Sequence, residues 1–172
     1  MAEHIVFLCT GNAARSVMAT IMFRARTDRH VVSGSGTHAL PGHPMSVRTR
    51  TALARLGLAD PTHRSAQFDE TDVRRASLIV AMAPEHVQWV RRVHPEAADR
   101  TVTLKRVVRT LTAPALSEAD AALRDRIRAL GLAGLDIEEW EEVVDPAGGE
   151  QPEFDACAQE IDALVDQLIA LL

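Results

Sequence analysis

Apolar positions along the chain follow two periods that alternate with each other. Short continuous apolar runs, typical of strands buried on both faces, lie at residues 4–8, 30–33, 77–82 and 101–104. Apolar residues spaced three and four apart, typical of amphipathic helices, lie at residues 16–26, 46–56, 84–94 and 153–172. Because alternating strands and helices favour parallel pairing, the pattern predicts an α/β fold. We expect a single-domain three-layer sandwich, a four-stranded parallel sheet with helices on both faces.

One region departs from this alternation. Ser117 is a plausible N-cap for a helix that ends at Gly131, and residues 136–145 (DIEEWEEVVD) are compatible with helix or loop. We therefore expect one domain over residues 1–172, with an acidic helical insertion at about 111–144. The insertion could be a lid, a surface that binds a partner, or a segment without a specific role.

Charge and composition exclude several classes of function. The net charge of -5 gives no electrostatic case for nucleic acid or an anionic membrane. No apolar run approaches the roughly 20 residues that span a bilayer, and the N-terminus does not resemble a signal peptide. Two cysteines make a disulfide framework unexpected, so we expect a cytoplasmic protein.

A thiol follows the first predicted strand, and a guanidinium stands six residues later. Cys9 ends the run IVFLC, and Arg15 and Ser16 stand at the start of the next predicted helix. Cysteine attacks as a thiolate, whereas a free thiol has a pKa of about 8.5. The helix N-terminus, the Arg15 charge and the Ser16 hydroxyl all favour the anionic sulfur. The same groups suit phosphate, since helix N-termini bind anions and arginine contacts two phosphate oxygens at once.

Small residues fill the loop between these two groups. Gly11 permits close backbone approach to a ligand, and Asn12 tolerates a left-handed conformation. A cysteine at the end of a buried strand is, taken alone, more often a core residue. The flanking strand, helix and small residues favour a phosphate-binding loop here. Its predicted members are Thr10, Gly11, Asn12, Ala13, Ala14, Arg15 and Ser16.

The loop resembles the C-x-G-N-x-x-R-S signature of the low-molecular-weight protein tyrosine phosphatases. The resemblance covers most of the chain, because further family features follow in order. They are the segment SGSGT at residues 33–37, His63, the strand and methionine at residues 78–82, and the pair Asp145 and Pro146. Such a joint occurrence is highly specific.

The resemblance implies a phosphatase that hydrolyses a phosphomonoester through a phosphocysteine. Cys9 is then the nucleophile, Arg15 holds the phosphoryl oxygens, and Asp145 protonates the leaving group. Water then hydrolyses the intermediate, with the same aspartate as base. No cofactor or metal is implied, because Arg15 and the helix N-terminus supply the positive field. The implied partner is a phosphorylated protein of the phosphotyrosine type or a small phosphate compound. The residues implied to support the loop are Asn12, Ser16 and His63.

Four glutamates shortly before Asp145 suggest how its proton could be retained. Near neighbours of like charge favour the protonated form of a carboxyl group. If these residues lie close to Asp145 in space, they keep it protonated at neutral pH. They are Glu138, Glu139, Glu141 and Glu142.

Several positions depart from the family pattern and bear on the substrate. Ala14 replaces a second loop cysteine, so the loop cannot protect Cys9 as a disulfide. Leu40 and residues 147–149 stand where aromatic side chains are usual, which predicts a weaker grip on phosphotyrosine. The Asp-Pro-x-Gly-Gly form resembles bacterial members, including protein arginine phosphatases. Those carry threonine at the position of Ala13.

The position of Gly34 is a further departure. The family has a serine there that supports the loop asparagine. Either Ser33 or Ser35 substitutes for it, or the network of Asn12 and His63 is weaker.

Three rival interpretations remain open. An arsenate reductase shares the fold and loop, but would need an external thiol, because Cys157 fits the apolar stripe of the last helix as a core residue. A non-catalytic oxyanion-binding module is the second. A metal site is the third. Of the histidines, only His38 and His43 lie close together in the sequence, and their spacing is not that of a structural zinc site. The histidines other than His63 are expected at the surface or at helix ends.

Overall fold

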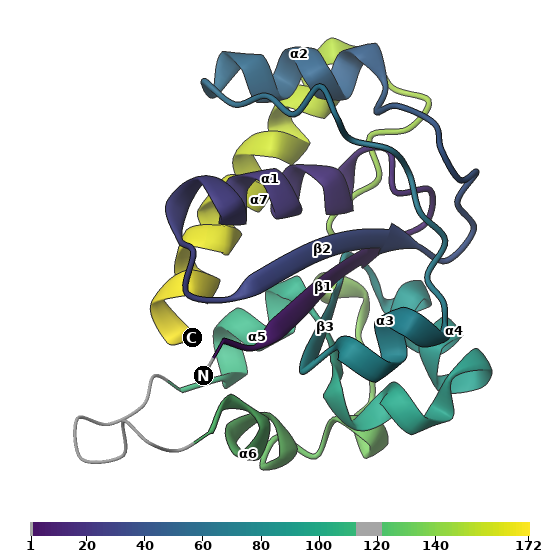
Figure 1. Ribbon diagram of the computed structural model, residues 1–172, viewed down its shortest axis with the longest axis vertical. Helices are drawn as coiled ribbons and strands as arrows, with labels where there is room; N and C mark the ends of the chain where they lie inside the picture. Colours follow the sequence, from purple (N-terminus) through teal and green to yellow (C-terminus); the bar gives the residue numbers. More distant parts are fainter. Residues whose placement is uncertain (1, 113–121) are drawn as a thin grey trace.

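Four parallel strands form one sheet in the order β2-β1-β3-β4 in the computed structural model, which describes residues 2–112 and 122–172 (Figure 1). The strands are β1 (His4–Cys9), β2 (Val31–Gly36), β3 (Leu78–Ala81) and β4 (Thr101–Thr103). β1 pairs with β2 on one side and β3 on the other, and β3 pairs with β4. This topology confirms the predicted four-stranded parallel sheet.

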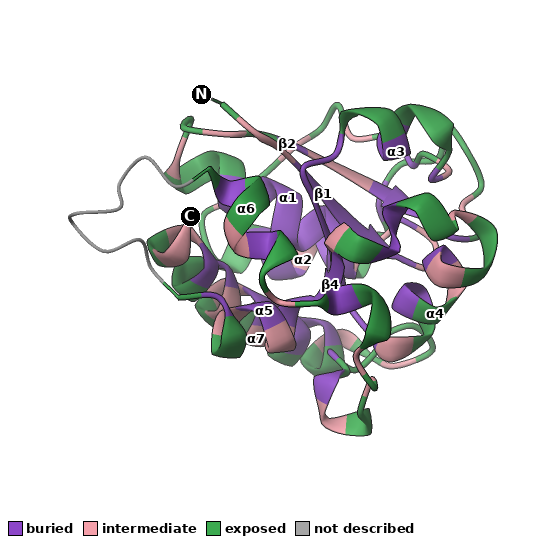
Figure 2. Cartoon of the chain, turned by 90° about the horizontal axis from the view of Figure 1, so that it is seen from below, coloured by how far each residue is buried: buried purple, intermediate pink, exposed green. Residues whose placement is uncertain are grey.

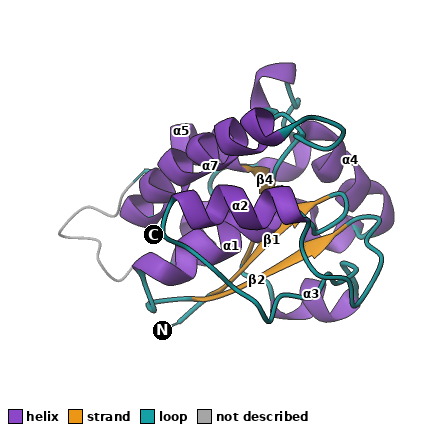
Figure 3. Cartoon of the chain, turned by 90° about the horizontal axis from the view of Figure 1, so that it is seen from above, coloured by secondary structure: helices purple, strands orange, loops and turns teal. Residues whose placement is uncertain are grey.

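Helices cover both faces of the sheet, as predicted (Figure 3). One face carries α1 (Arg15–Arg26), α2 (Val47–Arg55), α5 (Leu104–Thr110) and α7 (Gln151–Leu171), with α7 contacting the other three. The opposite face carries α3 (Glu70–Arg75) and α4 (Pro84–Val93). The remaining helical segments are η1 (Pro95–Arg100), α6 (Leu123–Arg128), η2 (Leu132–Gly134) and η3 (Glu139–Glu141).

Burial of β1 on both faces explains its unbroken apolar run. Ile5 and Phe7 belong to the large core beneath α1 and α7, whereas Val6 and Leu8 belong to a smaller core against α3 and α4. Successive strand side chains point to opposite faces, so consecutive apolar residues fill both cores. Figure 2 shows the strands as buried and the outer sides of the helices as exposed.

Two short helices were not predicted. α3 begins at a capping box in which the side chains of Asp69 and Asp72 each accept from backbone N–H groups. α5 begins at Thr103, whose hydroxyl accepts from the backbone N–H of Arg106. Both helices are too short to show an apolar period, and their caps are the sequence signal that was available.

The region at 111–144 is only partly helical where the structure describes it. α6, η2 and η3 lie within it; a turn ending at the left-handed Gly131 joins the first two, and residues 135–138, which have no regular secondary structure, join the last two. The proposed cap Ser117 lies outside the described residues. The acidic helical insertion as a unit stays a prediction. Within residues 2–112 and 122–172, no helix has the length and apolar character to cross a membrane.

The strand order reverses direction at β1. From β1 the chain continues to β2 on one side and then crosses to β3 on the other side. In parallel sheets of this kind, ligands bind beyond the carboxyl ends of the strands at such a reversal. Cys9 is the last residue of β1, and Arg15 opens α1. The fold therefore brings the predicted loop to the expected binding edge.

Candidate active site

The loop between β1 and α1 rests on the end of β2. The backbone N–H groups of Thr37 and His38 donate to the carbonyls of Cys9 and Thr10. A Cβ at Gly36 would stand 2.4 Å from the Thr10 carbonyl oxygen, so only glycine allows this approach. The SGSGT segment thus packs against the loop and supports its backbone.

A chain of hydrogen bonds reaches the sulfur of Cys9. The Asn12 amide donates to Ser16 Oγ at 2.9 Å, and Ser16 Oγ lies 3.0 Å from Cys9 Sγ. Because the Ser16 oxygen already accepts from Asn12, its own hydrogen is free to point at the sulfur. Cys9 itself is only 3 % exposed.

Asn12 is held in a left-handed conformation by contacts from outside the loop. Its φ is 50°, its Oδ1 accepts from the Ala66 N–H, and its backbone carbonyl accepts from His63 Nε2 at 3.0 Å. Burial lowers the pKa of His63, which keeps the imidazole neutral with the proton on Nε2. The structure therefore joins His63 to the loop, as the resemblance implied.

The space beside Gly34 is filled differently from either suggested substitution. A Cβ at Gly34 would stand 2.7 Å from Thr20 Oγ1 and 3.1 Å from the Asn12 amide nitrogen. Ser33 bonds instead to His4 and Arg75, and Ser35 Oγ has no hydrogen-bond partner among the described residues. Neither serine supports the asparagine, so that expectation was wrong.

Arg15 links the loop to the segment that carries Asp145. Its guanidinium donates to the Val143 carbonyl at 3.1 Å and to Asp145 Oδ2 at 3.0 Å. The Arg15 side chain is 2 % exposed, whereas that of Asp145 is 43 % exposed. Asp145 Oδ1 also accepts from the Ala147 N–H. Residues 130 positions apart thus meet at the carboxyl edge of the sheet.

The first turn of α1 is available to an anion. The N-cap residue Ala14 makes no side-chain hydrogen bond, and the first helical bond runs from Met18 N–H to the Ala14 carbonyl. The N–H groups before Met18 therefore lack helical acceptors. Thr49 of α2 steadies this end by donating to the Ala13 carbonyl at 3.0 Å, a contact that sequence reasoning missed.

Two of the four glutamates contact other residues than Asp145. Glu141 is 1 % exposed and binds Arg106 and Thr103. Glu138 also contacts Arg106 and accepts from the indole N–H of Trp140. The contacts of these residues are therefore structural, and they anchor the segment before Asp145 instead of crowding its carboxyl group.

His86 is a loop neighbour that the sequence analysis expected at the surface or at a helix end; it lies in the first turn of α4 but is buried. It is 1 % exposed, and its Nε2 lies 2.9 Å from Thr10 Oγ1. Burial, with a contribution from the Arg15 charge, lowers the pKa of His86 to about 3. The available signal was its position in the first turn of a helix that follows a strand at the binding edge.

An aromatic group near the loop comes from α4. The ring of His38, whose backbone bonds to Thr10, lies 6.1 Å from Trp89, which in turn packs against Phe68. Leu40 and Val144 are exposed by 71 % and 67 %. Of the positions predicted to lack aromatic side chains, Leu40 is therefore exposed and aliphatic.

Comparison with known proteins agrees with this geometry. The model of the low molecular weight phosphotyrosine protein phosphatase family matches residues 4–116. The chain belongs to this family. Like its members, it is a cysteine-dependent phosphatase that works through a phosphocysteine.

Relatives of this low molecular weight phosphatase carry two kinds of name. A protein-arginine-phosphatase of Geobacillus stearothermophilus is 28 % identical over 98 % of this chain and 95 % of its own length. A low molecular weight protein-tyrosine-phosphatase of Streptomyces coelicolor is 29 % identical over 99 % of this chain and 93 % of its own. The solved low molecular weight protein tyrosine phosphatase of T. tengcongensis superposes with a TM-score of 0.78 at 27 % identity, covering 99 % of this chain and all of that one.

The second cysteine of this phosphatase belongs to the core. Cys157 is 6 % exposed and packs among the residues that α7 contributes to the large core. Burial raises its pKa to about 12, so it is a protonated thiol. Among the described residues, no group of three histidine, cysteine or acidic side chains lies close enough together to hold a metal ion.

Proposed function

We propose that this phosphatase removes the phosphoryl group from a phosphorylated protein side chain, with Cys9, Arg15 and Asp145 as its catalytic residues. The observation that carries the proposal is the meeting of these groups at one edge of the sheet. Ser16 contacts the sulfur of Cys9, and the buried Arg15 contacts Asp145.

In the first step, the Cys9 thiolate attacks phosphorus and the bond to the leaving group breaks. The loop N–H groups and Arg15 hold the three remaining phosphoryl oxygens. Asp145 gives its proton to the departing atom, which leaves as a neutral alcohol or amine. The exposed side of Asp145 faces solvent, so substrate can reach it.

In the second step, water attacks the phosphocysteine. Asp145, now ionised, takes a proton from that water, and the bond between sulfur and phosphorus breaks. Inorganic phosphate leaves and the thiolate is restored. The same carboxyl group therefore acts once as acid and once as base.

Arg15 connects the two halves of this machinery. An arginine has five N–H hydrogens, and bonds to Val143 and Asp145 use two of them. The three remaining hydrogens are available to phosphoryl oxygens.

The preferred substrate is proposed to be a phosphotyrosine-type protein. Phosphoarginine is a second candidate, because the relative named protein-arginine-phosphatase matches over 98 % of this chain. Leu40 is exposed and aliphatic at a position where the family usually has an aromatic side chain, which favours an aryl group less.

A turnover panel with three variants tests the proposal. The panel contains an aryl phosphate, a phosphotyrosine peptide, a phosphoarginine peptide, and arsenate with an external thiol. Cys9→Ser is expected to abolish turnover and keep phosphate binding, whereas Arg15→Ala loses both. Asp145→Asn is expected to slow the first step most for poor leaving groups. Turnover by Cys9→Ser, or activity on arsenate alone, would overturn the proposal.

A further inference from the structure

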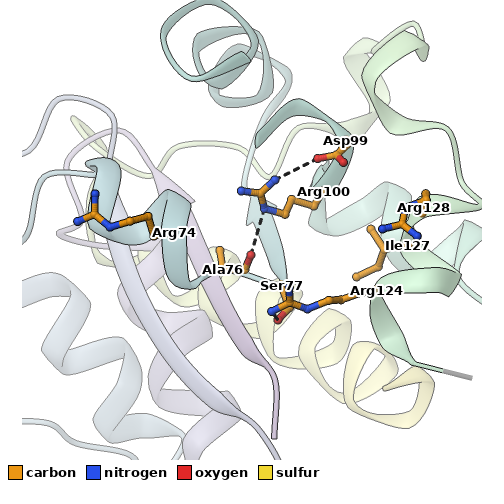
Figure 4. Close-up of a pocket in the computed structure, with 8 residues that line it drawn as sticks. All are labelled: Arg74, Ala76, Ser77, Asp99, Arg100, Arg124, Ile127 and Arg128. Carbon is orange, nitrogen blue, oxygen red and sulfur yellow. Dashed lines mark hydrogen bonds and ion pairs between the residues drawn. The ribbon is translucent and has the colours of Figure 1, made fainter. Parts of the chain in front are cut away.

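A second cationic hollow lies at the opposite edge of the sheet from the active site. It has a volume of about 250 Å³ and lies between α3, η1 and α6 (Figure 4). Ser77 and Arg100, which line it, directly precede β3 and β4. Because the strands are parallel, these residues mark the amino edge, whereas Cys9 ends its strand at the carboxyl edge.

Arginine dominates the lining. Four arginines and one acidic residue contribute to it. Each arginine also pairs with a carboxylate: Arg74 with Glu70, Arg100 with Asp99, Arg124 with Glu3 and Arg128 with Asp125. The arginines come from three separate elements, so the chain folds specifically to gather like charges here. They are Arg74, Arg100, Arg124 and Arg128.

Arg100 is held in place by neutral acceptors. Its Nε and Nη groups donate to the backbone carbonyls of Ala76, Val73 and Glu96, at 2.8 to 3.1 Å. Carbonyl oxygens orient a guanidinium without cancelling its charge. Arg100 is therefore a fixed cation, so little conformational entropy is lost when it meets an anion.

Arg124 adds a second cation beside a hydroxyl group. Its Nη2 donates to Ser77 Oγ at 3.1 Å and its Nε to Glu3 at 3.3 Å. Figure 4 shows the Arg124 guanidinium beside Ser77. The Ser77 hydroxyl donates its own hydrogen to Glu3, so the donor available to a phosphate oxygen is the guanidinium of Arg124.

Three of the four carboxylates that pair with these arginines are exposed, and Glu3 is the exception. Asp99 beside Arg100 is 63 % exposed, and Asp125 beside Arg128 is 66 % exposed. Exposed ion pairs contribute little free energy, so an anion of higher charge can displace such carboxylates.

We propose that this hollow is a second anion site, which binds a small phosphate-bearing compound apart from the active site. The volume fits one or two phosphate groups with a short carbon skeleton, and is below the usual range of about 300 to 1,000 Å³ for larger ligands. Inorganic phosphate, pyrophosphate and a small phosphate monoester share the chemistry that the arginines recognise.

Calorimetric titration with pyrophosphate, phosphate and glycerol phosphate tests the site. Wild-type protein is expected to bind two anions and Arg15→Ala one. In the Arg15→Ala background, Arg124→Gln with Arg128→Gln is expected to weaken the remaining site about tenfold or more, which corresponds to about 1.4 kcal/mol. The matched control is Arg29→Gln with Arg92→Gln, which removes the same charge from exposed positions outside the hollow.

Nuclear magnetic resonance locates the anion independently of the Arg15 variant. Addition of pyrophosphate to wild-type protein is expected to shift the amide signals of Ser77 and of α6 separately from those of the loop. The single variant Arg128→Gln serves if the double variant does not fold. Absence of saturable binding in Arg15→Ala with no shift at Ser77, or equal weakening in the control, would overturn the proposal.

Discussion

The Asn12 side chain determines which way the hydroxyl hydrogen of Ser16 points. By donating to Ser16 Oγ, it leaves that oxygen's hydrogen free for Cys9 Sγ, 3.0 Å away. A hydrogen bond to an ionised group stabilises it more than the neutral form. The left-handed backbone of Asn12 is thus a conformational cost that serves to orient one donor.

Ser16→Ala removes that donor and is expected to lower kcat/KM about tenfold to hundredfold, as for a lost hydrogen bond to a charged group. Ser35→Ala is the control, since Ser35 Oγ is buried without a partner among the described residues. An equal loss in both variants would show that packing, and not the hydrogen bond, is responsible.

Because His86 is buried, the free energy of unfolding is expected to depend on pH. Its folded pKa of about 3 lies below the ordinary value, so the unfolded chain takes up a proton first as pH falls. Its contribution to stability is therefore constant above pH about 6.5 and decreases from there towards pH about 3. Between pH 7.5 and 4.5, wild-type protein should lose about 2 to 3 kcal/mol more than His86→Gln, as measured by urea unfolding. Replacement of the exposed His43 by Gln should not reproduce this difference.

At the scale of elements, the segment before Asp145 is fastened at two points. Val143 donates to the Met82 carbonyl and accepts from Arg15, which ties the segment to the end of β3 and to the loop. Glu141, Thr103 and Arg106 form the second fastening, at β4 and α5. The side chain that bears the proposed proton is therefore positioned by two strands and two helices.

Glu141→Gln tests the second fastening. Burial opposes ionisation of Glu141, but hydrogen bonds from Arg106 and Thr103 outweigh it and lower its pKa. The variant should lose about 3 kcal/mol of stability at pH 7, because Arg106 is left without its buried partner. This difference should shrink as pH falls through the lowered folded pKa of Glu141, since wild-type protein then loses the same charge. Turnover of substrates with poor leaving groups should fall too, and the exposed Glu142→Gln should change neither quantity.

The sequence predicts the strands and longer helices better than it predicts the residues of the candidate active site. The four strands and the longer helices follow from local periodicity, and the loop from Cys9 to Ser16 is local as well. Asp145 was found through the family resemblance, because nothing local to residues 136–145 indicates its contact with Arg15. His86 and Thr49 were missed for the same reason, since each reaches the loop from a distant part of the chain. Long-range contacts of single side chains leave no periodic signal.

At the scale of the whole molecule, the two edges of the sheet have different roles. The carboxyl edge gathers Cys9, Arg15 and Asp145 from the two ends of the chain, and α7 packs beneath them against α1 and α2. The amino edge gathers the arginines of the proposed second anion site. Both sites depend on parallel strands, which bring equivalent ends together.

The number of thiols in the chain predicts how the enzyme responds to oxidation. The sequence contains two cysteines, and Ala14 stands where many members of the family have another. A thiol can rescue an oxidised cysteine by condensing with its sulfenic acid, and it must be ionised to do so efficiently. Burial raises the pKa of Cys157 to about 12, so this thiol reacts poorly with a sulfenic acid.

Hydrogen peroxide should therefore oxidise Cys9 further to the sulfinic acid, and dithiothreitol should not restore activity. Intact-mass measurement after peroxide treatment checks this, with Ala14→Cys expected to regain reversibility. Full recovery of the wild-type enzyme through a disulfide between Cys9 and Cys157 would contradict the argument, because it would require the core around α7 to open far enough to ionise and release a buried thiol.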